Sequence, residues 1–457
     1  MANSNGWGDG AANNAIGWGQ GANNNIGWGN SHATSWAGAT DIVGLDSSAS
    51  AFISAAGITD ATQISAINNL VVGMKADGLW SKMKAIYPFV TDNVNLFGYT
   101  TTFTSPNYVT DSTATFTLNN TTAPDGSNTG VRFTAVGSNN NYFYSANTQG
   151  GNNFGTGNKA FSIYVKAGTF SGSMSLGITS DGSTTRTNFS LTNDWQRITI
   201  TRNVIVAGNS AQYYIDLSGN SMTSGQYFYI WAPQFENGTT ATTYQPIATT
   251  QQAYIASQFK YNLKDPRDLD AAFRLVFNGG WTHSSTGATP NGTNGYADTK
   301  LNQSTNLSND SVHLCYYSRT NSSVNSFDIG GNSGLPNYYG AQIASYYTSI
   351  GTIGHLNSYP TDSTVSTAFS DTRAFYLASR ISATSNKLFR NASLLNTNTT
   401  TRTSTLANVN FRLASDAVGF TNREAAFASI GNGLTDTEAS NLYTRVQQFN
   451  TTLLRQV

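Results

Sequence analysis

The stretch Phe161-Ser162-Ile163-Tyr164-Val165-Lys166 alternates apolar residues with polar or amphipathic ones. Because successive side chains of a β-strand point to opposite faces, this period of two predicts a strand with one buried face. Similar short runs, separated by clusters of Gly, Asn and Ser, occur at 114–118, 130–135, 142–145, 174–178, 195–201, 212–217 and 227–232. About eight short strands at this spacing predict a β-sandwich or jelly roll.

The C-terminal half of the chain is also predicted to be β, between residues 251 and 433. Its candidate strands are 272–277, 312–318, 326–329, 341–347, 374–380, 387–391 and 418–421. The fold class predicted from the whole sequence is therefore mainly β, with two β-sandwich (jelly-roll or lectin-like) domains, an extended N-terminal segment and a few short helices.

Three helices are predicted outside the strands. The first begins at the N-cap Asp60 and ends at Asp77-Gly78, with an apolar face of Ile64, Ile67, Leu70, Val71 and Met74. A short second helix is expected to carry Leu79, Trp80, Met83 and Ile86 and to end at Tyr87-Pro88. The third closes the chain, where Thr435 and Glu438 form a capping box before an apolar stripe of Leu442, Val446, Phe449 and Leu453.

Charge is scarce in this chain and is balanced. Charged residues make up 11% of the 457 residues, and Lys plus Arg equal Asp plus Glu at 24 each. A neutral chain lacks the basic surface that phosphates demand, which argues against a nucleic-acid partner. Membrane insertion is not expected, because no stretch approaches the roughly 18 apolar residues of a span. A basic and then apolar N-terminal segment is also missing, so no secretion signal is expected.

A single cysteine, Cys315, excludes an intrachain disulfide and a cysteine-cluster metal site. It lies within the apolar run 312–317, which is expected to be a buried strand. A small core residue is therefore the favoured interpretation.

Gly-Trp-Gly units recur near the N-terminus at spacings of eleven and then ten residues. So short a segment cannot bury its own aromatic rings, and alone it would gain too little to offset its chain entropy. We interpret residues 1–45 as an anchor whose rings fill pockets on another protein, since tryptophan burial is a common interface hot spot. The anchoring residues would be Trp7, Trp18, Trp28, Trp36, Ile16 and Ile26. A flexible low-complexity leader is the alternative, and the regular tryptophan spacing argues against it.

These repeats resemble the virion-attachment leaders of some tailed-phage surface proteins, of the type found in crAss-like and other phages of Bacteroidetes hosts. The resemblance implies a protein of the virion surface, bound through residues 1–45 to capsid, auxiliary or tail proteins. It also implies a homo-oligomer, for which a trimer is expected because long surface fibres are usually trimeric.

The middle of the chain resembles a carbohydrate-binding-module-like sandwich that is frequent in phage tail proteins. The matching residues are 122–126, 161–168, 194–198, 229–238 and 241–246, with a departure at Pro233, where Gly-Ala is more typical. The C-terminal segment resembles a concanavalin-A/laminin-G-type sandwich, and its closing residues 429–436 and helical tail are similar to endings common in phage structural proteins. In such proteins residues like 79–88 run closely into the equivalent of 260–278, which implies an insertion between them.

The predicted organisation has four parts. Residues 1–45 are the extended anchor, and 46–93 are the helical first part of the lectin-like domain. Residues 94–250 are the inserted carbohydrate-binding-module-like sandwich, and 251–457 are the concanavalin-A/laminin-G-like sandwich with its C-terminal helix. The amphipathic helix near residue 60 supports this arrangement, because it needs a surface to pack against.

No arrangement of residues indicates catalysis, and we expect a non-enzymatic protein without a cofactor. The four histidines lack metal-ligand spacing, and neither a Gly-x-Ser-x-Gly elbow nor a phosphate-binding loop occurs. A glycosidase needs two carboxylates, but Glu236, Glu424 and Glu438 are the only glutamates and show no evident pairing. A pair of aspartates is the alternative, although the Asp spacing gives no indication of one. Asp265-Pro266-Arg267-Asp268 with Asp298 fits calcium and an ion-paired turn equally well, so no metal is assigned.

Sugar binding without cleavage fits the composition better, because aromatic rings and amide side chains are abundant. Candidate glycan-binding aromatics are Tyr142, Tyr144, Trp281, Tyr338 and Tyr339. The competing interpretation for each is a place in a sandwich core or a trimer contact. Glycan binding is at this point an implication of the fold resemblance.

The predicted function is a structural phage fibre or spike, attached to the head or tail of the particle by its N-terminus, whose sandwiches adhere to host surface glycans. One alternative is a receptor-binding tail fibre whose main role is host recognition. Another is a polysaccharide-degrading tailspike.

Overall fold

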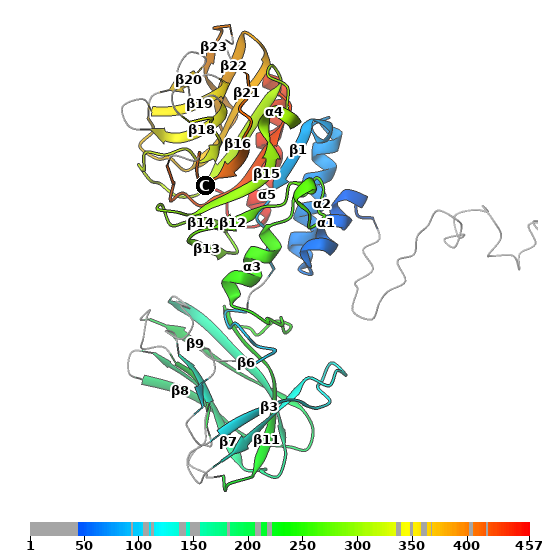
Figure 1. Cartoon of the computed structure of the whole chain (residues 1–457). Coiled ribbons are helices and arrows are strands. Elements are labelled where there is room, and N and C mark those ends of the chain that lie inside the picture. Colours follow the sequence, from blue (N-terminus) through cyan, green and yellow to red (C-terminus); the bar gives the residue numbers. More distant parts are fainter. Residues whose placement is uncertain are drawn as a thin grey trace, which may run out of the picture. The chain divides into compact units, whose positions relative to one another are not determined.

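The computed structural model divides the chain into two units, Met1–Ser47 and Ser48–Val457. It describes residues 44–92, 95–103, 109–110, 114–136, 143–146, 156–180, 183–205, 212–216, 222–334, 340–347, 351–357, 363–366, 368–401, 405–416 and 419–457. The predicted tryptophan anchor lies outside these residues. Four antiparallel sheets are the main secondary structure of the second unit, which confirms the mainly β fold class (Figure 1).

Two five-stranded sheets share one core and form what we call the cleft sandwich. One sheet has the order β3-β4-β11-β6-β9, and the other has the order β2-β5-β10-β7-β8. Their shared core includes Phe133, Ile163 and Phe228 from the first sheet with Leu176 and Ile178 from the second. The strands are β2 (Val109–Thr110), β3 (Ala114–Thr121), β4 (Gly130–Ala135), β5 (Phe143–Ala146), β6 (Gly157–Ala167), β7 (Ser173–Ser180), β8 (Ser183–Ser190), β9 (Gln196–Val204), β10 (Gln212–Asp216) and β11 (Tyr227–Asn237).

All eight strands predicted for this region are present, most of them longer than predicted. Sequence reasoning missed β2 and β8. The strand β8 reads Ser-Thr-Thr-Arg-Thr-Asn-Phe-Ser and pairs only with β7, at the edge of its sheet. A mostly solvent-facing edge strand has no apolar alternation to reveal it.

Two larger sheets form the terminal sandwich. The eight-stranded sheet has the order β13-β14-β25-β16-β21-β22-β23, with β1 beside β25, and the seven-stranded sheet has the order β12-β15-β24-β17-β18-β19-β20. Their shared core includes Leu314 and Ile430 from one sheet with Ile343, Leu356 and Leu413 from the other. The strands are β1 (Met83–Tyr87), β12 (Val276–Asn278), β13 (Trp281–Ser284), β14 (Gly287–Pro290), β15 (Tyr296–Asn302), β16 (Val312–Ser318), β17 (Ile329–Gly330), β18 (Gly340–Tyr347), β19 (Gly351–Asn357), β20 (Ser363–Ser366), β21 (Ala374–Ser382), β22 (Ser385–Arg390), β23 (Ser393–Asn398), β24 (Asn410–Leu413) and β25 (Ala425–Gly431).

The pairing of β1 with β25 brings together segments on either side of the cleft sandwich in the sequence. Met83 lies opposite Gly431, and Tyr87 lies opposite Ala428. The cleft sandwich is therefore contributed by a stretch of chain between two segments that share one sheet. The exact domain boundaries given above stay a prediction.

The helix predicted over 79–87 is wrong. The chain instead forms a 3-10 turn, η1 (Trp80–Lys82), followed by the strand β1, in which Met83, Ala85 and Tyr87 are buried. A short apolar run fits either period, and here the unpaired edge of β25 decides, because it supplies backbone partners that a helix would leave unmet.

Three strand predictions in the terminal sandwich also need correction. Residues 272–277 contain a 3-10 turn, η3 (Asp270–Ala272), and a left-handed Phe273 (φ 60°) before β12 begins. The strand predicted over 326–329 begins only at Ile329. Within 418–421, Phe420 forms a single bridge with Ser415, and Val418 lies outside the described residues.

The other helix predictions are confirmed. α2 (Ala61–Ala76) begins at the N-cap Asp60, whose carboxylate accepts the Gln63 amide at 2.9 Å, and Gly78 follows it at φ +73°. α5 (Asp436–Thr452) has the predicted capping box of Thr435 and Glu438. The helices α1 (Ser47–Ala56), α3 (Gln251–Phe259) and α4 (Gln303–Asn306) were not predicted.

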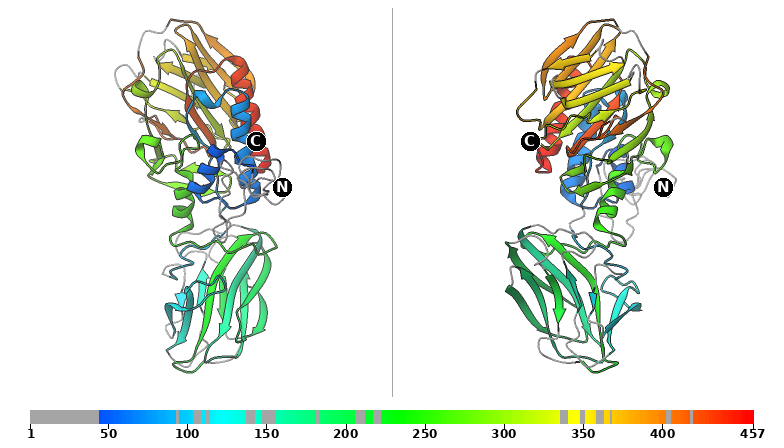
Figure 2. Two further views of the ribbon diagram at one scale, coloured as in Figure 1. Left: turned by 90° about the vertical axis from the view of Figure 1, so that its right-hand side faces the viewer. Right: turned by 60° about the vertical axis from the view of Figure 1, so that its left-hand side comes forward.

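α2 and α5 lie side by side against the terminal sandwich (Figure 2). Arg445 of α5 donates to the Asp77 carboxylate through Nε (2.7 Å) and Nη2 (3.0 Å), which ties the two helices together. No helix in the described parts of the chain combines the length and the apolar character needed to cross a membrane.

Cys315 is buried in β16, as predicted. Its sulfur lies 3.0 Å from Ser429 Oγ, and burial raises the pKa of the thiol to about 12. A thiol that stays protonated is a poor nucleophile and a poor metal ligand, so this residue is part of the core.

Candidate functional site

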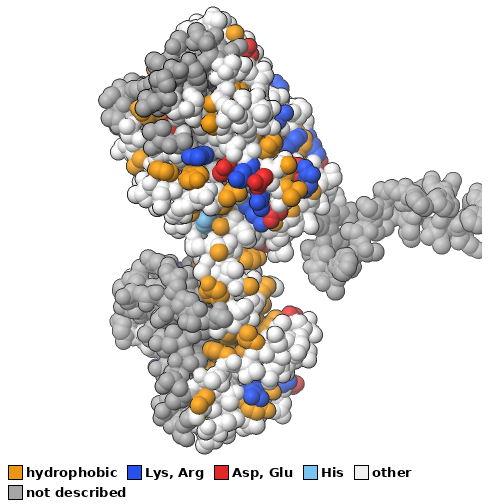
Figure 3. All heavy atoms as spheres, viewed as in Figure 1, with side chains coloured by type: hydrophobic (Ala, Val, Ile, Leu, Met, Phe, Trp, Pro, Cys, Tyr) orange, Lys and Arg blue, Asp and Glu red, His pale blue; other side chains and the backbone are white. Residues whose placement is uncertain are grey.

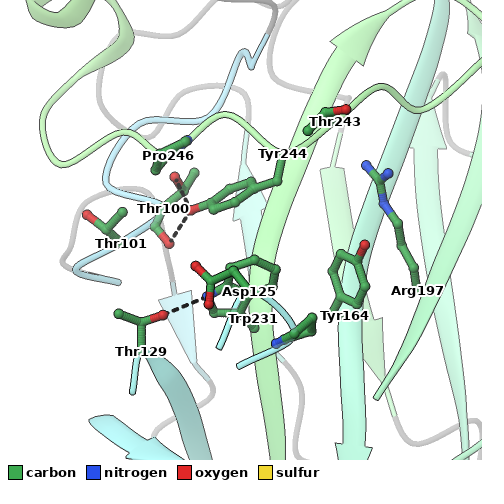
Figure 4. Close-up of a pocket in the computed structure, with 11 residues that line it drawn as sticks. Thr100, Thr101, Asp125, Thr129, Tyr164, Arg197, Trp231, Thr243, Tyr244 and Pro246 are labelled. Carbon is green, nitrogen blue, oxygen red and sulfur yellow. Dashed lines mark hydrogen bonds between the residues drawn. The ribbon is translucent and has the colours of Figure 1, made fainter. Parts of the chain in front are cut away.

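A cleft of about 480 Å³ opens on the β3-β4-β11-β6-β9 sheet of the cleft sandwich (Figure 4). Three of its side chains come from neighbouring strands in one row. In this row Tyr164 of β6 lies opposite Trp231 of β11 on one side and opposite Arg197 of β9 on the other. The complete lining is Thr100, Thr101, Pro124, Asp125, Thr129, Tyr164, Arg197, Trp231, Thr243, Tyr244 and Pro246.

The sequence of β11 explains why aromatic rings face outward here. Phe228 and Ile230 are fully buried in the sandwich core, whereas Tyr227, Tyr229 and Trp231 are half-buried on the opposite face. Alternation along the strand therefore gives the sheet an apolar inner face and an aromatic outer face. Aromatic side chains that core packing does not need are candidates for ligand contacts.

Trp231 is the centre of the cleft. Its ring meets Tyr164 edge-on, with centroids 5.3 Å apart, and meets Tyr244 edge-on at 5.1 Å. Its Nε1 donates to Thr129 Oγ1 at 3.0 Å, which fixes the orientation of the indole. Three rings from two strands and one loop thus form a rigid apolar surface with hydroxyl groups at its border (Figure 4).

A bulge in β11 creates the support for the loop that carries Tyr244. The register with β6 shifts between Trp231 and Gln234, where Ala232 has a positive φ of 54°. Pro233 lies inside this bulge, and a residue without an amide hydrogen is tolerated there because the ladder is already interrupted. The extra residue places Gln234 and Glu236 on the outer side of the strand, where residues 242–245 cover them.

Gln234 and Glu236 are buried and hold that loop by a dense set of hydrogen bonds. The Glu236 carboxylate accepts from the Thr242 amide (2.8 Å) and the Thr242 hydroxyl (2.7 Å). Gln234 donates to the Thr243 carbonyl (3.1 Å) and accepts from the Gln245 amide (2.8 Å). These bonds fix the backbone on both sides of Tyr244.

The hydroxyl group of Tyr244 is held as firmly as its backbone. It donates to Thr100, with the Thr100 carbonyl at 3.2 Å and the hydroxyl oxygen at 2.9 Å, and burial raises the pKa of the phenol well above its ordinary value. Tyr244 therefore stays neutral and acts as one wall of the cleft.

Two charged side chains line the cleft, Arg197 and Asp125. Arg197 lies beside Tyr164, with its guanidinium 5.6 Å from the ring centroid, and Nη2 donates to Ser162 Oγ (2.9 Å) and to the Thr242 carbonyl (2.5 Å). Asp125 lies near Trp231, and its Oδ1 accepts from the amide (2.9 Å) and hydroxyl (2.6 Å) of Ser127 (Figure 4).

This cleft contains none of the aromatic residues selected from the sequence. Trp281 of β13 is half-buried, packs on the core of the terminal sandwich, and donates through Nε1 to the Asn278 carbonyl at 3.0 Å. Tyr144 lies in β5, of which the structure describes the backbone. Tyr142, Tyr338 and Tyr339 lie outside the described residues. The assignment of these five to a glycan site stays a prediction.

One sequence signal could have indicated the cleft. Tyr227, Tyr229 and Trp231 occupy the positions of an alternating strand where polar residues usually stand. An aromatic residue at every solvent-facing position of a strand is unusual, because the opposite face already supplies the core. Tyr244 and Arg197 had no comparable signal, since strand order and loop packing bring them to the site.

Acidic side chains are sparse at this site. Among the lining residues, Asp125 alone carries a carboxyl group, and the nearby Glu236 is buried and hydrogen-bonded to Thr242. Within the described ranges, His, Cys, Asp and Glu side chains nowhere gather in groups of three or more suited to a metal ion.

Comparison with known proteins gives structural likenesses at low sequence identity. The C-terminal family 22 carbohydrate-binding module of Clostridium thermocellum Xyn10B is 15% identical, with a TM-score of 0.26, and the match covers 34% of this chain and 99% of the module. TmCBM61, solved in complex with β-1,4-galactotriose, is 13% identical (TM-score 0.24; 32% and 97% covered). Domain 4 of AbnA, an extracellular arabinanase of Geobacillus stearothermophilus solved with arabinotriose, is 15% identical (TM-score 0.28; 37% and 80% covered). No protein-family model and no curated protein matches the sequence.

Proposed function

We propose that this protein binds glycans in the cleft around Trp231. The observation that carries the proposal is the set of three aromatic rings, Tyr164, Trp231 and Tyr244, fixed at centroid distances of 5.1–5.3 Å with polar groups at their edges. A sugar ring has apolar C–H faces and a border of hydroxyl groups, so it needs an apolar surface flanked by hydrogen-bonding groups.

The rigidity of the cleft supports binding as its role. Hydrogen bonds hold the indole through Thr129 and the Tyr244 loop through Glu236, so little conformational entropy is lost when a ligand arrives. Asp125 is the single carboxyl group of the lining, whereas glycoside hydrolysis needs two carboxyl groups across the scissile bond. The geometry therefore favours adhesion over cleavage.

Replacing the central ring tests the proposal. Trp231→Ala is expected to weaken binding to immobilised polysaccharides by roughly 30-fold or more, the effect of losing an interface hot spot. Trp195→Ala is the matched control, because Trp195 directly precedes β9 of the same sheet and donates to the Thr122 carbonyl (2.9 Å) but does not line the cleft. Equal loss in both variants, or no loss in Trp231→Ala, would overturn the site.

The same polysaccharides distinguish adhesion from degradation. Incubation with the purified protein is expected to leave their chain length unchanged, as measured by size-exclusion chromatography. Shortened chains would instead support a polysaccharide-degrading tailspike.

We further propose that the protein is part of a phage virion surface, attached by residues 1–45 as a homotrimer, with its sandwiches exposed to host glycans. The regular Gly-Trp-Gly spacing in the sequence supports this proposal. Deletion of residues 1–45 is expected to abolish copurification with particles while leaving the Trp231-dependent binding of polysaccharides intact. Full incorporation of the truncated protein would refute the anchor.

A further inference from the structure

Arg197 has a positive charge that no acidic side chain of the described residues neutralises. Its two acceptors within the described residues, Ser162 Oγ and the Thr242 carbonyl, are neutral, and both accept from Nη2. Nε is buried without an acceptor, and Nη1 makes no hydrogen bond within the described residues. A cation removed from water is stabilised by an anionic partner or, like the fully buried Arg455, by neutral acceptors on all of its nitrogens, and Arg197 has neither.

Other arginines of the chain with carboxylates nearby form tight pairs. Arg319 donates to Glu424 at 2.9 Å, and Arg445 holds Asp77 through two nitrogens. Arg197 differs from them because it lines a cleft, so its anionic partner can come from outside the chain.

The row Trp231, Tyr164 and Arg197 across the sheet determines how far a bound ligand must reach to contact both Trp231 and Arg197. Neighbouring strands lie roughly 4.8 Å apart, so Arg197 and Trp231, two strands apart, are separated by about 10 Å at the backbone. Tyr164 stands between them. A sugar ring that lies against the aromatic side chains can therefore direct one of its substituents toward the guanidinium of Arg197.

The other charged side chain of the cleft has the complementary chemistry. Asp125 uses Oδ1 for its two bonds to Ser127, and Oδ2 accepts no hydrogen bond from the described residues. A carboxylate with a free oxygen accepts hydrogen bonds from hydroxyl groups and repels an anion. Such a polarity would place the anionic group of a ligand at Arg197 and its hydroxyl groups at Asp125, both of which line the cleft (Figure 4).

We propose that the cleft selects carboxylate-bearing sugars, such as uronic acids or sialic acids, with the carboxylate bound by Arg197. This inference rests on the proposed glycan-binding function and narrows its ligand class. A guanidinium suits this role, because its planar set of donors matches a carboxylate better than an ammonium group does.

The test compares each acidic glycan with its own neutral form. Full-length protein is titrated calorimetrically with oligomers of galacturonate, mannuronate and sialic acid, and with the methyl esters of the same oligomers. At least one acid is expected to bind roughly ten- to hundred-fold more tightly than its ester, the effect of one charge-assisted hydrogen-bonded contact. Raising the salt concentration should reduce this preference.

Arg197→Gln is expected to remove the difference between acid and ester. Arg197 also holds the Thr242 carbonyl, so this variant can loosen the Tyr244 loop as well. A looser loop would weaken the binding of the acid and of the ester equally, so it cannot by itself change the ratio of their affinities. Arg132→Gln is the control, because Arg132 lies on the same face over Tyr227 (4.9 Å) and outside the cleft, and it should keep the full preference.

Equal binding of acids and esters, or a preference that survives in Arg197→Gln, would overturn the inference. A protein that binds only neutral glycans, in a Trp231-dependent way, would retain the proposed function and lose the acidic ligand class. Failure of every acidic and neutral glycan to bind would overturn both.

Discussion

The two sandwiches of this chain use their large polar and aromatic side chains in opposite ways. In the cleft sandwich, rings such as Trp231 and Tyr229 face outward, and the core beneath them consists of apolar residues such as Phe228 and Ile230. In the terminal sandwich, the largest fully buried side chains include three arginines, Arg380, Arg423 and Arg455. One sandwich displays groups that can bind a partner, and the other uses comparable groups to hold itself together.

This difference matters because the chain has few charges to place. Lys, Arg, Asp and Glu make up 11% of the sequence, and on the face drawn in Figure 3 blue and red side chains occupy a small part of the surface, mostly together in the upper body. Several of these rare charges are nevertheless buried in the terminal sandwich. Arg423 and Asp328 are both fully buried there, and Arg423 Nη1 donates to Asp328 Oδ1 at 2.8 Å.

Breaking the buried pair is expected to have the largest effect on stability. Arg423→Met leaves the Asp328 carboxylate buried without its partner, which should lower the unfolding free energy by about 3–5 kcal/mol. Chemical denaturation measures this loss. Arg373→Met, which breaks the exposed pair of Arg373 with Asp371, should change it little.

The same variant tests the comparison itself. The loss should be confined to the terminal sandwich, so Trp231-dependent glycan binding should persist at temperatures at which the terminal sandwich of Arg423→Met has already unfolded. Loss of glycan binding in step with the terminal sandwich would show that the two cores are not independent.

The terminal sandwich should lose more stability than the cleft sandwich when the pH is lowered. His283 and His313 are buried in it, and burial lowers the pKa of each to about 4. Between about pH 6.5 and 4 the unfolded chain binds protons that the native state excludes. The stability contribution is therefore complete above about pH 6.5 and is lost as the pH falls toward 4, by on the order of 2 kcal/mol for each histidine at pH 5.

His283→Phe isolates one half of this effect. Neither ring nitrogen of His283 has a hydrogen-bond partner within the described residues, and Phe277 (4.7 Å) and Trp281 (6.1 Å) surround the ring, so phenylalanine should fit. The unfolding free energy of the variant, measured by denaturation between pH 7 and 4, should depend less steeply on pH than that of the original protein, because unfolding takes up about one proton fewer. An unchanged slope would show that His283 is not the titrating group.

The features that the sequence predicts well are those that depend on local signals. Apolar alternation identified every strand of the cleft sandwich except the two-residue β2 and the polar edge strand β8. Capping residues placed α2 and α5 within a residue of their ends, because Asp60 and Thr435 act through local hydrogen bonds. Local signals of this kind require no knowledge of what lies across the fold.

Sequence reasoning missed the strands β13, β14, β15, β19, β20, β23, β24 and β25 of the terminal sandwich, and it also missed decisions that depend on distant parts of the chain. The segment 83–87 is apolar in a way that fits helix or strand, and β25, more than 300 residues away, decides for the strand. The cleft was missed for the same reason. Trp231, Tyr164 and Arg197 are far apart in sequence, and only the strand order β11-β6-β9 makes them neighbours.

A third prediction concerns the single buried carboxylate that supports the cleft. Glu236→Gln replaces an acceptor of two Thr242 bonds with an amide that can accept only through one oxygen. The stability of the cleft sandwich should fall by roughly 1–2 kcal/mol, and glycan affinity should fall several-fold because the Tyr244 loop is less fixed. Pairing the change with Thr242→Val gives a double-mutant cycle, in which additive losses would contradict a direct Glu236–Thr242 contact.

The smallest effect is expected from removing the hydrogen bond that orients the Trp231 indole. Thr129→Val removes the acceptor for Trp231 Nε1 and keeps the shape of the side chain, so the ring stays in the cleft with more freedom. Because an ordinary hydrogen bond contributes about 1 kcal/mol, glycan affinity should fall roughly fivefold, and the melting temperature should change little. Calorimetric titration should place this loss in the binding entropy, since the ring must now be ordered by the ligand. A loss as large as that of Trp231→Ala would mean that Thr129 itself contacts the sugar, and the polar border of the cleft would then matter more than its rings.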